Sequence, residues 1–63
     1  MISVGDFIAR SKERSYAVAK EAGLDPTSPD LILTVNLIAA AEAEAYVKML
    51  HVMEHQAPSH SPP

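Results

Sequence analysis

A chain of 63 residues with no cysteine forms at most one small domain, and disulfide bonds cannot stabilise it. Such a chain buries only about 60% of its unfolded surface, so its own hydrophobic core is marginal. The net charge of −3, the pI near 5.4 and the absence of Trp argue against a nucleic-acid-binding protein.

The first predicted helix covers residues 3–22. Ser3 and Asp6 have the spacing of a capping box, with Asp in place of the usual Glu, which marks the start of the helix. Gly23 follows the last periodic residue and predicts the stop. One face of this helix is apolar, while the opposite face is charged and expected to be solvated. The apolar residues predicted for the hairpin core are Val4, Phe7, Ile8 and Val18.

Residues 23–28 form the predicted turn, because Pro26 and Pro29 each keep the preceding residue out of helical geometry. A connection this short predicts an antiparallel helical hairpin. The helix–Pro-x-x-Pro–helix layout resembles the subunits of type III secretion needles in size and in its turn, Pro26-Thr27-Ser28-Pro29. Needle subunits have a more polar second helix that ends in a tract which this chain lacks. The resemblance implies a structural subunit of a larger helical assembly.

The second predicted helix covers residues 29–56, which contain no glycine and no proline after Pro29. At the helical period its apolar residues fall on two roughly opposite sides. We expect the first side to pack on the first helix and complete the hairpin core with Leu31, Val35, Ile38, Ala45, Tyr46 and Met49. The second side is the predicted oligomer interface and consists of Leu33, Leu37, Ala40 and Val47. A hairpin leaves this second side bare, which favours a dimeric four-helix bundle.

Glu42 is the one charge in the middle of the predicted core side, and it is the candidate specificity charge. Folding about the turn pairs positions that sum to roughly 53, which brings Ser11 level with Glu42 and Phe7 level with Tyr46. A buried acid there would set the register or receive a partner's Arg. The alternative is an acid at the bundle edge whose carboxylate reaches water.

A metalloprotease-like pattern, His51-x-x-Glu54-His55, places two imidazoles on one helical face. No third ligand or cleft is evident, so we expect a solvated helix end, with no metal, no cofactor and no catalytic residue. The apolar run of residues 31–41 is about half of the roughly 20 needed to cross a bilayer, so we expect no membrane span. Residues 57–63 are expected to form a flexible Pro/Ser/His tail.

The sequence therefore predicts an all-α protein, an antiparallel two-helix hairpin that assembles with itself. The function expected from it is a small non-enzymatic interaction module that binds and modulates an unidentified protein. Accessory or regulatory proteins of phages and mobile elements have this build. The alternative is a structural subunit of a larger assembly. The N-terminus lacks a secretory pattern, so the expected location is the cytoplasm.

Overall fold

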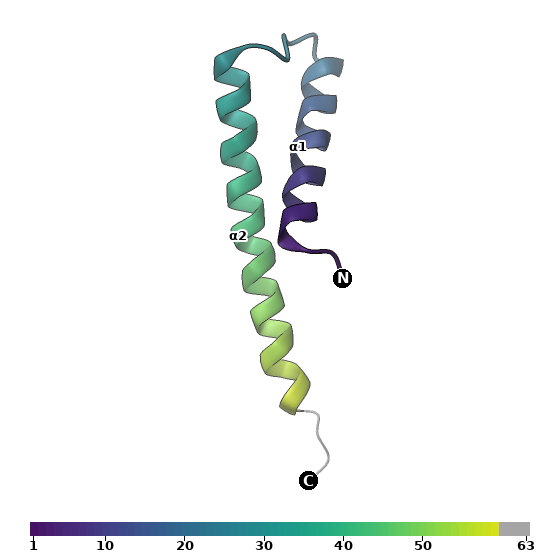
Figure 1. Ribbon diagram of the computed structural model, residues 1–63, viewed down its shortest axis with the longest axis vertical. Helices are drawn as coiled ribbons and strands as arrows, with labels where there is room; N and C mark the ends of the chain where they lie inside the picture. Colours follow the sequence, from purple (N-terminus) through teal and green to yellow (C-terminus); the bar gives the residue numbers. More distant parts are fainter. Residues whose placement is uncertain (60–63) are drawn as a thin grey trace.

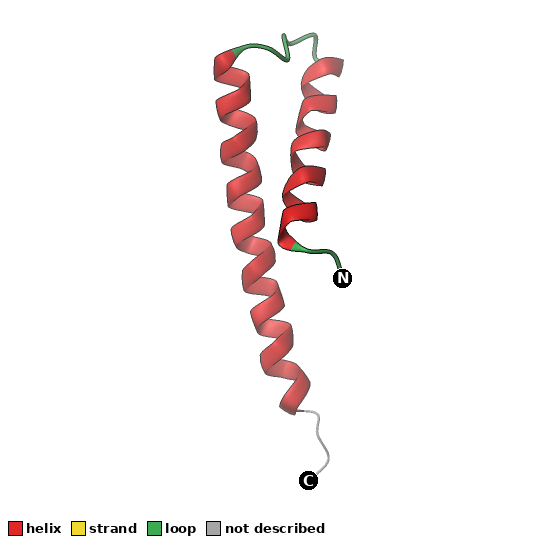
Figure 2. Cartoon of the chain, viewed as in Figure 1, coloured by secondary structure: helices red, strands yellow, loops and turns green. Residues whose placement is uncertain are grey.

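The computed structural model describes the backbone of residues 1–59 and the side chains of residues 1–55. In this part of the chain two helices, α1 (Val4–Glu21) and α2 (Pro29–Ser59), run antiparallel and pack side by side (Figure 1). Figure 2 shows helices and turns throughout the described residues, with no strand. The predicted all-α hairpin is confirmed. The molecule is a rod of 57 × 16 × 16 Å.

Both ends of α1 carry the signals that the sequence predicts. The Ser3 Oγ accepts a hydrogen bond from the Asp6 amide at 3.1 Å, so the hydroxyl satisfies one of the free amides of the first turn. At the other end Gly23 has a φ of 78°, the left-handed conformation that glycine adopts without steric cost. The amide of Leu24 then donates to the Ala19 carbonyl at 2.9 Å, which completes a Schellman stop.

The turn between the helices is organised by Asp25. Its carboxylate accepts hydrogen bonds from the Thr27 hydroxyl at 2.7 Å and the Thr27 amide at 2.9 Å. These two bonds, the hydroxyl first, lower the pKa of Asp25 below its ordinary value of 3.8. The first backbone hydrogen bond of α2 runs from the Ile32 amide to the Ser28 carbonyl at 3.0 Å.

The C-terminal boundary of α2 differs from the prediction. We expected the helix to end at Gln56 and a flexible tail to cover residues 57–63, but α2 continues to Ser59. The prediction rested on the polar, proline-rich composition of residues 57–63. Residues 60–63 of the predicted tail lie outside the described residues.

The seam between α1 and α2 is made of small side chains. Among the described residues only five are buried, and four of them are Ala or Ser; they are Ser11, Ala19, Val35, Ala39 and Ala43. Short side chains allow the two backbones to approach closely, so the helices gain dispersion contacts along the seam. The result is a closely packed but thin core.

The residues that form this seam differ in part from those predicted for the hairpin core. Five of the residues predicted for it are exposed in the single chain: Val4, Val18, Ile38, Ala45 and Met49. On α2 the buried face lies one residue further round the helix, at Ala39 instead of Ile38 and at Tyr46 instead of Ala45. The physical reason is that a close approach through alanine excludes the larger side chains from the contact. Of the other predicted core residues, Val35 is 1% exposed, while Phe7, Ile8, Leu31 and Tyr46 are half-buried.

The end of the hairpin away from the turn is closed by an aromatic pair. The rings of Phe7 and Tyr46 stack with their centroids 4.4 Å apart. The Tyr46 hydroxyl donates a hydrogen bond to the Ile2 carbonyl at 2.7 Å and so holds the N-terminal segment against α2. Beyond this level α2 continues without α1 beside it (Figure 1). We name residues 50–59 the α2 overhang.

Candidate interaction surfaces

An open apolar groove lies between α1 and α2 at the end of the hairpin near the turn. Its volume is about 410 Å³. The groove exists because the helices touch through small residues, while longer apolar side chains stand along both rims without meeting. Its apolar lining comes from both helices and the turn: Val18, Ala19, Ala22, Leu24, Leu31, Val35 and Ile38. Its polar lining consists of Arg14, Ser15, Thr34 and Glu42.

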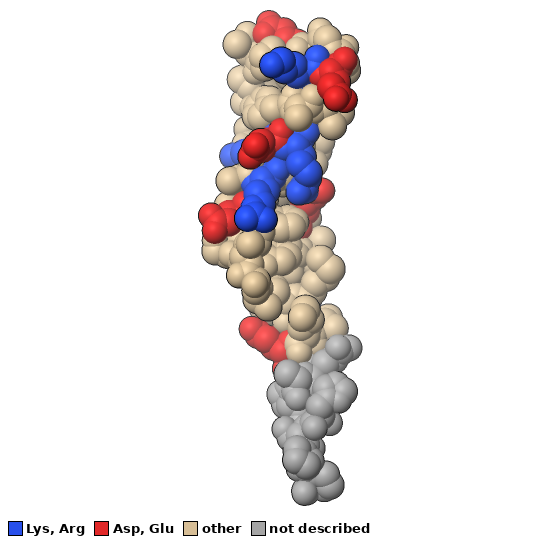
Figure 3. All heavy atoms as spheres, turned by 90° about the vertical axis from the view of Figure 1, so that its right-hand side faces the viewer, with Lys and Arg blue, Asp and Glu red and all other residues tan. Residues whose placement is uncertain are grey.

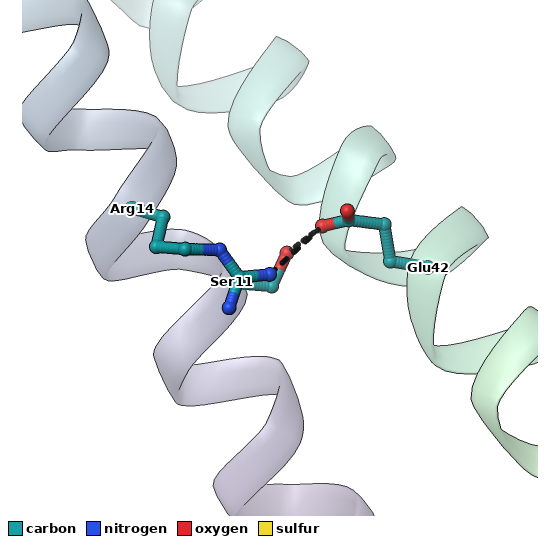
Figure 4. Close-up of polar contacts among 3 residues, drawn as sticks. All are labelled: Ser11, Arg14 and Glu42. Carbon is teal, nitrogen blue, oxygen red and sulfur yellow. Dashed lines mark hydrogen bonds and ion pairs between the residues drawn. The ribbon is translucent and has the colours of Figure 1, made fainter.

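Three polar side chains, Ser11, Arg14 and Glu42, meet between the helices (Figure 4), and two of them, Arg14 and Glu42, line the groove. The Ser11 hydroxyl, 1% exposed, donates a hydrogen bond to Glu42 Oε1. Arg14, which also belongs to α1, reaches the same oxygen at 3.8 Å. The Glu42 side chain stays 44% exposed, so the candidate specificity charge is neither buried nor free. It contacts α1 with one oxygen and leaves the other available.

The predicted register is present in these contacts. Ser11 with Glu42 and Phe7 with Tyr46 both meet, as expected from pairs that sum to 53.

A stripe of exposed apolar residues continues from the groove rim along α2. It consists of Ile38, Ala45, Met49 and Val52, whose spacings of 7, 4 and 3 residues follow a heptad pattern. We name these four residues the heptad face. Met49 is 56% exposed, although methionine in a folded domain is more often interior. This face is the part of the predicted core side that α1 does not cover.

A second exposed apolar surface lies on the side of α2 away from α1. Leu33 and Leu37 are 60% and 62% exposed, and Ala40 is exposed beside them. We name these three residues the outer face. Val47, the fourth residue predicted for the oligomer interface, is half-buried and lies one residue from the half-buried Tyr46. The predicted interface set is therefore largely together, with Val47 at its edge.

The outer side of α1 is charged and mixed in sign. In Figure 3 blue Lys and Arg side chains gather over the middle of α1, with red acidic side chains among and around them. Lys12 is half-buried, while Arg10, Glu13 and Arg14 are exposed. This alternation gives a solvated surface without a strong field of one sign.

The two histidines of the metalloprotease-like pattern are exposed on the α2 overhang. His51 and His55 both lie beyond the end of α1. In the part of the chain that the structure describes, no three His, Cys, Asp or Glu side chains come close enough to hold a metal ion.

Sequence reasoning missed the alanine seam. The signal for it is the series Val35, Ala39 and Ala43, which repeats every four residues and places small side chains on one side of α2. A ranking by hydrophobic size favours Ile38 and Met49 and passes over alanine. The groove and the heptad face follow directly from this choice of seam.

These surfaces define a small helical hairpin with two exposed apolar faces. No helix in the described residues combines the length and the apolar character that a bilayer span requires. No protein-family model matches the sequence, and neither a curated protein nor a solved structure is significantly similar to it.

Proposed function

We propose that this protein is a non-enzymatic interaction module that associates with itself and binds another protein, whose activity it modulates. One observation supports the proposal above the others: large apolar side chains of α2 are exposed on two sides of the same helix. Leu37 on the outer face and Met49 on the heptad face are each more than half exposed. Contiguous apolar surface of this kind in a small protein is typical of interaction sites.

Two apolar faces suit two different contacts. One face can close a dimer, most simply a four-helix bundle, and the other then remains for a protein partner. Each square ångström of apolar surface removed from water contributes about 25 cal/mol, so either face has a driving force for burial. The thin core of the hairpin favours association as well, because the single chain buries few large side chains.

The class of accessory or regulatory proteins, including those of phages and mobile elements, fits a module of this size, and the cytoplasm is the compartment that we propose. Modulation of a partner requires only that the bound hairpin covers or reshapes a surface of that partner. No catalytic group of the hairpin takes part in this mechanism.

Sedimentation velocity over a range of micromolar concentrations tests the self-association. We expect a mass of two chains that stays constant at high concentration. A compact monomer throughout that range contradicts the proposal.

Affinity capture from the source cell then tests the binding of a partner. If the outer face binds the partner, Leu37→Lys should remove the captured protein and leave the dimer mass unchanged. The matched control is Glu13→Gln, which changes the charge by the same amount on the solvated side of α1 and should retain the partner.

A structural subunit of a larger assembly is the second candidate, and the same two faces support it. If the heptad face of one chain binds the outer face of the next, the contact is heterologous and the assembly stays open. Light scattering separates the two functions, because an open assembly keeps growing with concentration, whereas a closed dimer reaches a plateau.

A further inference from the structure

We propose that the heptad face binds a second copy of this chain with the two α2 helices antiparallel, so that Met49, Val52 and Met53 of each copy fill the groove of the other. This inference rests on the self-association proposed above and names its surface and geometry. It assigns the dimer to the heptad face, whereas the sequence alone favours the outer face. The outer face then remains for the other protein.

The exposed area of the single chain is sufficient for a stable dimer. The chain exposes 4953 Å². A compact protein of 6.8 kDa exposes about 4,000 Å², so the excess is roughly 1,000 Å². A stable interface buries about 800 Å² on each partner. The excess is therefore large enough to supply one such interface.

The groove and the overhang are complementary in position. The groove centres near the level of residues 31–38 of α2, and the exposed Met49, Val52 and Met53 lie at and beyond the other end of the hairpin. A two-fold axis between these levels brings each overhang beside the groove of the other copy. In a parallel dimer the overhangs meet each other and both grooves stay open to water.

Charge favours the same orientation. Glu42 occupies a core position of the heptad series that contains Ile38, Ala45 and Met49, so a parallel pair places the two Glu42 carboxylates opposite each other. Like charges in such a contact repel. In the antiparallel pair the two Glu42 levels are offset by three residues, about 4.5 Å along the helices, so each Glu42 faces Ala45 of the second copy, and Lys48 of that copy lies within about one helical turn.

In the antiparallel dimer, large apolar side chains of one copy lie opposite large apolar side chains of the other. Positions that sum to 87 meet across the axis, which pairs Ile38 with Met49 of the second copy and places Val52 of that copy over the groove, at the level of the buried Val35. Ala45 lies next to the axis, where its small side chain lets the helices approach. The Thr34 hydroxyl at the groove already donates to the Asp30 carbonyl at 2.8 Å, so covering it leaves no unsatisfied donor.

Single-cysteine variants test this geometry directly, because the chain has no cysteine of its own. Ala45→Cys, Val52→Cys and Leu37→Cys each introduce one thiol at an exposed position. The purified variants are oxidised mildly and the rate of covalent dimer formation is read on a non-reducing gel. Circular dichroism and sedimentation before oxidation establish that each variant is helical and dimeric.

We expect Ala45→Cys to form covalent dimers at least about tenfold faster than the other two variants, because a disulfide needs Cα atoms within about 7 Å. In the antiparallel dimer the two Val52 positions are about 25 Å apart along the helices. A mixture of Ile38→Cys and Met49→Cys should form a covalent dimer that contains one chain of each kind. Each of these two variants alone should not.

Three results overturn the inference. Rapid coupling of Val52→Cys means a parallel dimer, rapid coupling of Leu37→Cys means a dimer through the outer face, and slow coupling of all three in a dimeric protein means another surface. A monomeric wild-type chain in sedimentation contradicts the proposed self-association itself and is distinguished from these results before any oxidation.

Discussion

The rings of Phe7 and Tyr46 lie parallel, with an interplanar angle of 1°, although 39 positions separate them in the chain. The Tyr46 hydroxyl adds a hydrogen bond to the Ile2 carbonyl, so one side chain of α2 holds both the first turn of α1 and the segment before it. Beyond the end of α1 the second helix continues alone (Figure 1).

Tyr46→Phe should lower the free energy of unfolding by about 1 kcal/mol, because it removes the hydroxyl donor and keeps the stacked ring. Thermal denaturation at a fixed protein concentration measures the change. Tyr16→Phe is the control, since the Tyr16 hydroxyl has no hydrogen bond among the described residues. An equal loss in both variants would show that the Ile2 contact contributes nothing specific.

Glu42→Ala should destabilise the protein by about 1–3 kcal/mol, because it leaves the buried Ser11 hydroxyl without its acceptor. Glu42→Gln keeps an acceptor oxygen and loses only a partly exposed ion pair with Arg14, so it should cost less than about 1 kcal/mol. Urea denaturation of both variants gives the comparison. In a Ser11→Ala background Glu42→Ala should become nearly neutral, and a full loss there would contradict the assigned hydrogen bond.

Gly23→Ala should cost about 1–2 kcal/mol, because a side chain at this φ is strained even though the added methyl group has open space around it. Gly5→Ala is the matched control within α1, where the new Cβ meets only Ser3 Oγ at an ordinary 3.9 Å. That change should stabilise the helix by about 0.5–1 kcal/mol. Opposite signs in thermal denaturation are the expected result, and stabilisation by both would exclude the left-handed stop.

Asp25 should titrate below 3.8 in the folded protein, because the Thr27 hydroxyl and amide stabilise its charged form. A lowered folded pKa means that this group stabilises the fold at pH values above 3.8 and that the contribution is lost as pH falls through the folded pKa. Carboxyl-carbon NMR measures the titration. Thr27→Val removes the hydroxyl donor and keeps the amide, so the pKa should move part of the way back. A wild-type value at or above 3.8 would contradict the turn geometry.

Most of the fold could be predicted from local signals in the sequence. The Ser3 cap, the Gly23 stop and the proline-bracketed turn are each set by neighbours in sequence, and they place α1 and the start of α2 within one residue. The register follows from the turn by chain geometry alone. For this reason the Ser11–Glu42 and Phe7–Tyr46 contacts could be predicted from the sequence.

The rotation of α2 about its axis could not be predicted from the sequence in the same way. The helix has apolar residues on more than one side, and periodicity does not distinguish a side that meets α1 from one that meets another chain. Ile38 and Met49 outrank Ala39 in hydrophobic size, yet the close contact selects alanine. The candidate surfaces depend on this rotation, so they required the structure.

The alanine seam also determines which mutations the chain can accumulate. At Ala39 and Ala43 any larger side chain forces the helices apart, whereas Leu37 on the surface can change size without moving a backbone. In most cores a substitution that shortens a side chain destabilises the fold more than one that enlarges it. In this seam the reverse holds, because enlargement harms the hairpin more than truncation does. Distant relatives should keep Ala, Ser or Gly at positions 11, 19, 39 and 43, while their larger apolar residues on the surface change in size and remain apolar. The spacing of small residues, and not overall hydropathy, is then the pattern by which such relatives would be recognised.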